Sequence, residues 1–295
     1  MAEYDNPEIP EGINVSPTHP LKEFALLVGG ISALVIVAVL VLSLLAGTLA
    51  RHVPFAQEQA LAESLSSHWT ASAKPSAVEQ QRQAYLQALA DRLVAVMPLP
   101  EDMRVRVHYA PGETVNAMAT LGGHIIVFQG LIDTLPNENA LAMVLAHEIA
   151  HIRHRHPIVA MGRGFTVALA LSSLAGIGDG VMQDWIGGLG LLPVLSFSRS
   201  QEEVADGDAL QAMQQLYGHV EGAASFFEYV ARQTPALSSP DLFNTHPGDE
   251  KRIERIRHFQ RSHPAPTNPP LVALPAFMGA REAGKAKPPP SRTSD

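Results

Sequence analysis

Two histidines and a glutamate stand in the pattern H-E-x-x-H, at His147, Glu148 and His151. They lie in residues 137–156, an apolar run without internal glycine or proline, and this run predicts a helix. Side chains four residues apart share one face of a helix, so both imidazoles can bind the same metal ion. Glu148 can then reach a water on that ion. The alternative is a solvated helix whose histidines bind water, but the neighbouring residues are apolar. Two imidazoles and a carboxylate in apolar surroundings need a partner, so the pattern predicts a zinc site.

A catalytic zinc needs a third protein ligand, normally from another element. The predicted helix at 198–217 is acidic, and Glu202 and Asp206 are four residues apart on one of its faces. One of these carboxylates would bind the metal, and the other would hold a ligand imidazole by its second ring nitrogen. Glu203 points to another side and is expected to be solvated. An ordinary acidic helix face is the alternative that spacing alone leaves open.

Composition excludes several classes of protein. The 295 residues carry a net charge of -8 and contain no basic stripe, which argues against a nucleic-acid partner. The absence of cysteine excludes a disulfide framework and a thiolate zinc site. It leaves the compartment undecided, because cysteine-free chains occur in both redox environments.

The N-terminal part predicts a membrane anchor. Residues 1–23 are polar and contain several prolines, which indicates a disordered tail. Residues 24–50 contain no charged side chain and exceed the roughly 20 residues that span a bilayer as a helix. They are too long for a signal peptide, so we expect one uncleaved transmembrane helix. Lys22 and Arg51 flank it almost symmetrically, which leaves both orientations open. We prefer a single-pass protein of a bacterial inner membrane with its domain in the periplasm.

The rest of the chain predicts an α+β fold, mainly α, with a small β-sheet. Residues 51–76 form a juxtamembrane connector, residues 77–261 form the folded domain, and the proline-rich residues 262–295 form a disordered tail. Periodicity predicts helices at 77–97, 137–156, 198–217, 219–233 and 248–261, and strands at 103–109, 115–120 and 124–128.

A second apolar region covers residues 158–197. It consists of two pieces of about 13 residues each, which are too short to span a bilayer comfortably. They are either core helices or a hydrophobic hairpin, residues 165–197, that touches membrane lipid or lines the substrate groove.

Four stretches together resemble a known family, the integral-membrane zinc metallopeptidases typified by the heat-shock protease HtpX and the type 1 CAAX prenyl protease. In order they read NAMATLGGHIIVFQGLID, LAMVLAHEIAHIRHRH, SFSRSQEEVADGDAL and NTHPGDEKRIERI, within about residues 80–260. The resemblance implies a gluzincin-type peptidase domain with one Zn²⁺ per chain. It implies Glu202 as the third ligand, supported by Asp206 and Arg199, because the family pattern S-R-x-x-E-x-x-A-D matches from Ser198.

Three further histidines lie in or near these motifs. Thr245-His246-Pro247 matches a family motif, so His246 would lie near the metal and stabilise an oxyanion or occupy the open zinc position. A turn histidine before proline is the alternative. His154 and His156 are assigned to the end of the motif helix, where positive charge complements the helix dipole. The chain departs from HtpX by lacking several full-length spans, which resembles the smaller members of the family.

The expected reaction is peptide-bond hydrolysis, in which Glu148 takes a proton from water and passes it to the leaving amine. An extended polypeptide, from misfolded or envelope proteins, would pair with a strand edge. That edge is predicted at Gly123, His124, Ile125, Ile126 and Val127. The main alternative is a membrane-anchored chaperone-like or binding factor with a closed zinc site. Glu148 favours catalysis, because a structural site does not use that carboxylate. A non-peptidase zinc hydrolase is a third interpretation. The oligomeric state stays open.

Overall fold

The computed structural model forms two units that divide inside the first helix, residues 1–42 and residues 43–295. Helix α1 (Pro20–Ala50) contains the predicted anchor and begins a few residues before it. By length and composition it is the one helix among the described residues that could cross a membrane. The structure describes residues 19–66, 75–100, 102–175, 197–233, 250–267 and 269–279.

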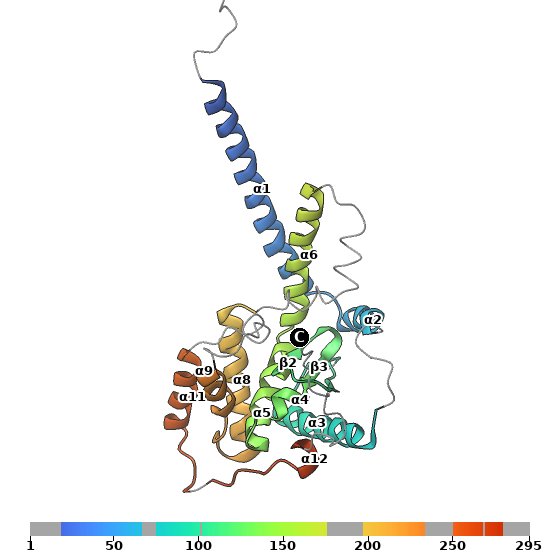
Figure 1. Ribbon diagram of the computed structural model, residues 1–295, viewed down its shortest axis with the longest axis vertical. Coiled ribbons are helices and arrows are strands. Elements are labelled where there is room, and N and C mark those ends of the chain that lie inside the picture. The colour runs from blue at the N-terminus through green and yellow to red at the C-terminus, as the bar shows by residue number, and fades with distance from the viewer. Residues whose placement is uncertain are drawn as a thin grey trace, which may run out of the picture. The chain divides into compact units, whose positions relative to one another are not determined.

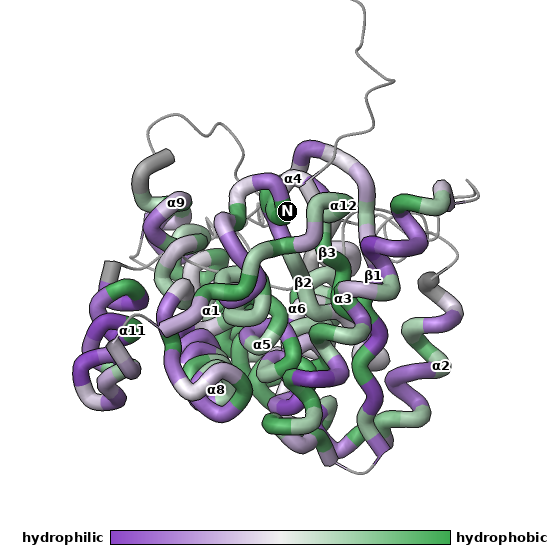
Figure 2. The backbone as a smooth tube through the Cα atoms, turned by 90° about the horizontal axis from the view of Figure 1, so that it is seen from below, coloured by the Kyte–Doolittle hydropathy of each residue, from purple (hydrophilic) through white to green (hydrophobic). Residues whose placement is uncertain are grey.

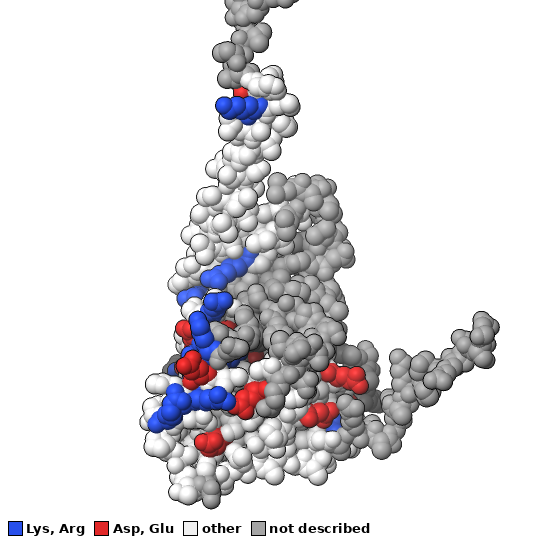
Figure 3. Space-filling view, turned by 60° about the vertical axis from the view of Figure 1, so that its left-hand side comes forward, with Lys and Arg blue, Asp and Glu red and all other residues white. Residues whose placement is uncertain are grey.

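The second unit is mainly helical with a small sheet, as the sequence predicts (Figure 1). On the described part of the face seen in Figure 3, acidic and basic side chains lie near one another. Its helices are α2 (Phe55–Ser66), α3 (Ala77–Val96), η1 (Leu121–Gly123), α4 (Gln129–Ile132), α5 (Glu138–Arg153), α6 (His156–Ala175), α8 (Arg199–Tyr217), α9 (Ser225–Gln233), α11 (Glu250–Ser262) and α12 (Ala276–Gly279), and its strands are β1 (Arg106–Ala110), β2 (Ala117–Ala119) and β3 (His124–Phe128).

The sheet has the order β1-β3-β2, so β3 is the middle strand. It runs parallel to β1 and antiparallel to β2. The predicted substrate edge at 123–127 is therefore wrong, because both sides of β3 already pair with neighbouring strands. β2 lies at one edge of the sheet instead. The sequence showed that β2 and β3 are joined by Gly122 and Gly123, but it did not show that β1 adds to the far side of β3.

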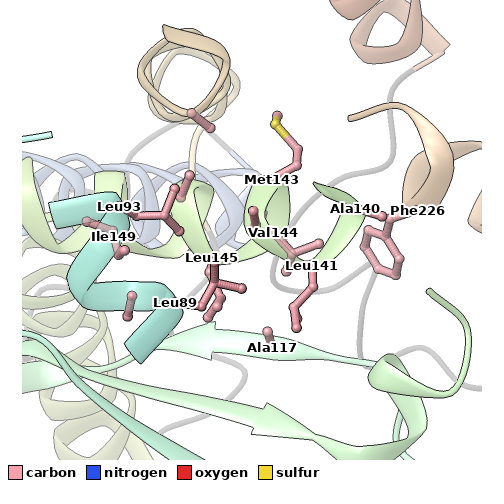
Figure 4. Close-up of a cluster of buried hydrophobic side chains, with 14 of the residues drawn as sticks. Leu89, Leu93, Ala117, Ala140, Leu141, Met143, Val144, Leu145, Ile149 and Phe226 are labelled. Atoms are coloured by element: carbon pink, nitrogen blue, oxygen red, sulfur yellow. The ribbon is translucent and has the colours of Figure 1, made fainter. Parts of the chain in front are cut away.

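Helix α5 is the centre of the domain and packs against α8, α3 and β2 (Figures 1 and 4). Leu141 and Leu145 face α3 and the sheet, whereas Met143 faces the opposite side. Because α5 is covered all round, every residue from Glu138 to Ile152 is buried, whereas Figure 2 shows more hydrophilic turns on α8 and α11. Asn137 is the N-cap of α5, since the amide of Ala140 donates to the side chain of Asn137 at 2.9 Å.

The motif helix ends earlier than predicted, at Arg153. A turn through Arg155, whose φ is 59°, leads directly into α6, and Pro157 is the second residue of that helix. Proline is tolerated in a first helical turn, so Pro157 begins the next helix and does not simply end the previous one. The helix α6 exposes several large apolar side chains. Residues 176–196, which hold the second predicted apolar piece, lie outside the described residues.

The C-terminal segment is a second correction. We expected disorder from residue 262 onward, but residues 269–279 pack against the domain. Val272 accepts a hydrogen bond from the Glu138 amide at 2.8 Å, at the start of α5. Met278 is fully buried in the main core. The segment is therefore packed on the folded domain, because it accepts the hydrogen bond of the Glu138 amide of α5 and its helix α12 packs against α3.

Candidate metal centre

The structure brings together His147 and His151 from α5 and Glu202 from α8. All three are buried, and their ligand atoms lie within 4.8 Å of one another. The two Nε2 atoms are 3.0 Å apart, and the carboxylate oxygens of Glu202 lie 3.3 Å from His147 Nε2 and 3.5 Å from His151 Nε2. The spacing of the motif and of the acidic helix therefore produces one convergent group of donor atoms.

The donor set fits zinc. Tetrahedral coordination with bonds of about 2.0–2.2 Å puts neighbouring ligand atoms roughly 3.3–3.6 Å apart. The observed separations of 3.0, 3.3 and 3.5 Å need only small adjustments. Two imidazoles and one carboxylate also match the three-ligand set of catalytic zinc sites, which leave one position for water.

Helix α8 reaches this position because its start is fixed and its inner face is small. Ser198 and Gln201 form a reciprocal capping box at the N-terminus. Ala205 and Ala209 are fully buried, so α8 can lie close to α5. Glu202 lies on this inner face, whereas Glu203 is exposed, as the spacing predicts.

Asp206 holds the outer nitrogen of the first histidine. Its Oδ1 lies 3.0 Å from His147 Nδ1, which fixes the ring orientation. Burial alone would raise the pKa of Asp206, but the charge of Arg252 and the hydrogen bond with His147 lower it to about 2. Asp206 is therefore ionised at neutral pH. Burial and Arg252 disfavour the imidazolium form of His147, yet the carboxylates of Asp206 and Glu202 raise the pKa of His147 to about 9.

His156 holds the second ligand, a role that sequence reasoning missed. Its Nδ1 lies 2.8 Å from the Nδ1 of His151, and Phe197 stacks on the His151 ring with centroids 4.0 Å apart. Burial, followed by the nearby His154, lowers the pKa of His156 to about 4. The residue is thus neutral at pH 7 and does not supply the positive charge that we expected at the helix end. Only the turn at Arg155 brings it back to α5.

Glu148 lies beside the ligands and is also buried. Its Oε2 accepts a hydrogen bond from the amide of Ala119 at 2.6 Å. Ala119 is the last residue of β2, so this contact joins the carboxylate to the edge of the sheet. The sequence predicted the carboxylate but gave no indication of this partner.

The comparisons with known proteins agree with this geometry. The model of peptidase family M48 matches residues 80–260, which is more than half of the chain. The chain belongs to peptidase family M48. This confirms the resemblance to HtpX-like zinc metallopeptidases.

Three proteins named as peptidases are similar in sequence to this chain. The chain is 30% identical to mitochondrial metalloendopeptidase OMA1 of Schizosaccharomyces pombe, over 59% of this chain and 52% of the relative. It is 26% identical to the beta-barrel assembly-enhancing protease of Yersinia pestis, over 72% and 46%. It is 33% identical to metalloprotease LoiP of Escherichia coli, over 48% and 58%. The chain thus spans about half the length of these relatives.

Arg252 of α11 also belongs to the metal centre, and the sequence did not reveal this role. Its Nη2 lies 3.0 Å from Glu202 Oε2, 2.7 Å from Asp206 Oδ1 and 2.9 Å from His147 Nε2. The guanidinium is buried and stacks over the ring of Phe227 at 4.4 Å. The buried face of α11 combines Arg252 with Ile256, whereas Ile253 is only partly buried. One sequence signal could have identified Arg252, because it is a charged residue on the inner face of an amphipathic helix.

Two expected residues are not placed at the M48 site. Arg199, implied as a supporting residue, is exposed at the start of α8 and makes no ion pair with the described carboxylates. Arg252 makes the contacts that we expected from it. His246 lies outside the described residues, and so do its neighbours in the motif.

Proposed function

We propose that the protein is a zinc-dependent endopeptidase that hydrolyses peptide bonds in polypeptide substrates. The convergence of His147, His151 and Glu202 beside the buried carboxylate of Glu148 carries this proposal. Bound zinc supplies a Lewis acid that polarises the scissile carbonyl and makes water nucleophilic near neutral pH.

Glu148 is the general base in this proposal. It accepts a proton from the attacking water and later donates it to the leaving amine. Helix geometry supports the role, since Glu148 directly follows the ligand His147 on α5. The Ala119 amide holds Oε2 at 2.6 Å, which fixes the carboxylate before substrate arrives. Asp206 and His156 keep the two ligand imidazoles in the orientation that directs both Nε2 atoms inward.

The edge of β2 presents the substrate. The Thr120 amide donates to His124 and the Phe128 amide donates to Asn116, so these groups point toward β3. Main-chain groups alternate along a strand, and those of Ala117 and Ala119 therefore face the opposite side. The Ala119 amide already donates to Glu148, so an extended polypeptide can pair there through the main-chain groups of Ala117 and the carbonyl of Ala119, next to Glu148. This replaces the edge that we expected on β3.

We propose a membrane anchor through α1, with further lipid contact along α6. A Cβ at Gly162 would lie 3.1 Å from the Ala46 carbonyl oxygen, so the end of α1 packs closely on α6. Farther along α6, Phe165, Val167 and Leu169 are more than two-fifths exposed. An apolar face beside the end of an anchor suits the membrane interface.

The domain is proposed to face the periplasm of a bacterial inner membrane and to act on misfolded or envelope proteins. Two bacterial relatives support this proposal, one named as a beta-barrel assembly-enhancing protease and one as an HtpX homolog. A closed zinc site in a chaperone-like factor is not favoured, because it gives no role to Glu148.

The decisive experiment compares Glu148→Gln with Glu203→Gln in the full chain, purified in detergent. Wild type and Glu203→Gln should digest casein, and a chelator should stop digestion until zinc is restored. Glu148→Gln should keep one zinc per chain but lose activity by about 10²–10⁴-fold. Casein digestion by Glu148→Gln at the wild-type rate would refute the assignment of the base. Chelator-insensitive digestion would refute the zinc mechanism.

A further inference from the structure

Helix α2, which follows the end of α1 after a short turn, buries a carboxylate. Phe55, Glu58 and Ala62 share one face of this helix, and Glu58 is only 3% exposed. An ionised carboxylate removed from water needs charged or hydrogen-bonding partners. A helix serving only as a linker to the membrane has no need of such a residue on its inner face.

The two oxygens of Glu58 contact two different parts of the domain. Oε1 accepts a hydrogen bond from the amide of Gly122 at 2.9 Å. Oε2 receives the Nη2 group of Arg155 at 2.7 Å. Gly122 lies in the turn between β2 and β3, and Arg155 lies in the turn between α5 and α6. One side chain thus joins two turns that are distant in the sequence.

The contact between Glu58 and the Gly122 amide depends on a close approach of the Gly122 backbone to α2. Gly122 has a φ of 69°, and a Cβ there would lie 2.8 Å from the Ala62 Cβ and 3.2 Å from the Gln59 Cα. Glycine is therefore required both by the backbone conformation and by the distance to α2. The turn that ends the proposed substrate edge rests directly on the juxtamembrane helix.

The second contact reaches the zinc ligands. Arg155 is the one non-glycine residue with positive φ in the described part of the chain, at 59°. Its side chain also lies over the ring of Phe55, with Cζ 5.8 Å from the ring centroid. The next residue is His156, whose Nδ1 holds His151. Glu58 therefore stabilises the unusual turn that returns His156 to the metal centre.

We propose that Glu58 is a positioning residue of the peptidase, and that α2 belongs to the catalytic unit. Glu58 touches neither the ligands nor the substrate edge; it acts through Gly122 on β2 and through Arg155 on His156. The expected effect of Glu58 on catalysis rests on the proposed peptidase activity. The coupling of the Gly122 turn to the Arg155 turn does not depend on that activity.

The kinetic test uses Glu58→Gln in the full chain in detergent, with Glu63→Gln as the matched control. Glu63 is exposed on the same helix. The Glu58→Gln side chain keeps an oxygen for the Gly122 amide but loses the charge that pairs with Arg155. We expect kcat/KM on casein-derived peptides to fall about ten-fold, mostly through a higher KM, with zinc content unchanged. Equal kinetics in the two variants would overturn the proposal. So would activity lost only in step with zinc content and melting temperature, because that result indicates a purely structural role.

A second measurement remains informative if no activity is found. Hydrogen exchange should become faster in Glu58→Gln at residues 117–124 and 152–158, and should be unchanged in Glu63→Gln. Unchanged exchange at both turns would overturn the coupling. If wild type cleaves nothing while exchange responds as expected, the peptidase proposal fails and the coupling stands.

Discussion

Arg252 of α11 donates two hydrogen bonds to Asp206 of α8, from Nε at 2.8 Å and from Nη2 at 2.7 Å, both to Oδ1. The same oxygen lies 3.0 Å from His147 Nδ1. Helix α11 therefore helps to hold the ring of His147, a proposed zinc ligand, through this one carboxylate oxygen of Asp206.

Replacing Arg252 by Met should strongly destabilise the metal-free protein. The substitution keeps much of the apolar stem but leaves the buried carboxylates of Asp206 and Glu202 without their main cation. Breaking a buried pair of this kind costs about 3–5 kcal/mol of unfolding free energy. Urea unfolding in the presence of a chelator measures this loss.

Arg257→Met is the control on the same helix. Arg257 pairs with Glu228 at 2.9 Å, but its side chain is 58% exposed. An exposed pair contributes about 1 kcal/mol or less. Equal losses in the two variants would contradict the central role assigned to Arg252.

Glu202→Gln should remove a zinc ligand, whereas Glu203→Gln should leave the site intact. The neighbouring residues differ only in their position on α8, one buried and one exposed. Because changes beyond the ligands already cost about 10–100-fold in metal affinity, Glu202→Gln should lose at least about 100-fold. Zinc titration against a competing chelator measures both variants, and similar affinities would contradict the assignment.

Glu138 should make folding stability depend on pH. Burial alone would raise the pKa of Glu138, but hydrogen bonds from Tyr85 and Tyr217 and the charge of Arg92 hold it below the ordinary value of 4.5. The Tyr217 hydroxyl lies 2.8 Å away and the Arg92 Nη1 group 2.9 Å away. A carboxylate with a lowered pKa stabilises the fold above its unfolded pKa, and this contribution disappears as pH falls through the folded pKa.

Glu138→Gln should therefore reduce the unfolding free energy by about 1–3 kcal/mol at pH 7. The difference from wild type should shrink as pH falls below 4.5, the unfolded value. Chemical unfolding across a pH series measures it, with exposed Glu113→Gln as control. A difference that stays constant or grows on acidification would contradict the assigned sign.

The sequence predicted what depends on local spacing. The four-residue spacing predicted that His147 and His151 share one helix face, and that Glu202 and Asp206 share one face of another helix. Helix geometry also predicted that Glu203 points to a different side from Glu202. The N-cap at Asn137 was also predictable from its own segment. These features need no knowledge of distant parts of the chain.

The features that the sequence missed depend on contacts between distant segments. Arg252 reaches the site from another helix, and His156 returns to α5 only because Arg155 adopts a positive φ. The position of β3 inside the sheet depends on parallel pairing with β1, which single-strand patterns do not reveal. Resemblance gave Arg199 a role that the geometry assigns to Arg252.

The C-terminal segment provides the last prediction. Met278 is fully buried, and the Met278 carbonyl accepts a hydrogen bond from Gln129 at 2.9 Å. Met278→Ala should therefore cost about 2–5 kcal/mol, because the cavity lies in the main core. Leu271→Ala, in a side chain that is 50% exposed, should change stability by about 0.5 kcal/mol or less. Thermal and urea unfolding of both variants measure the contrast. If both variants match wild type, the segment does not belong to the folded domain, and disorder from residue 262 is the better description.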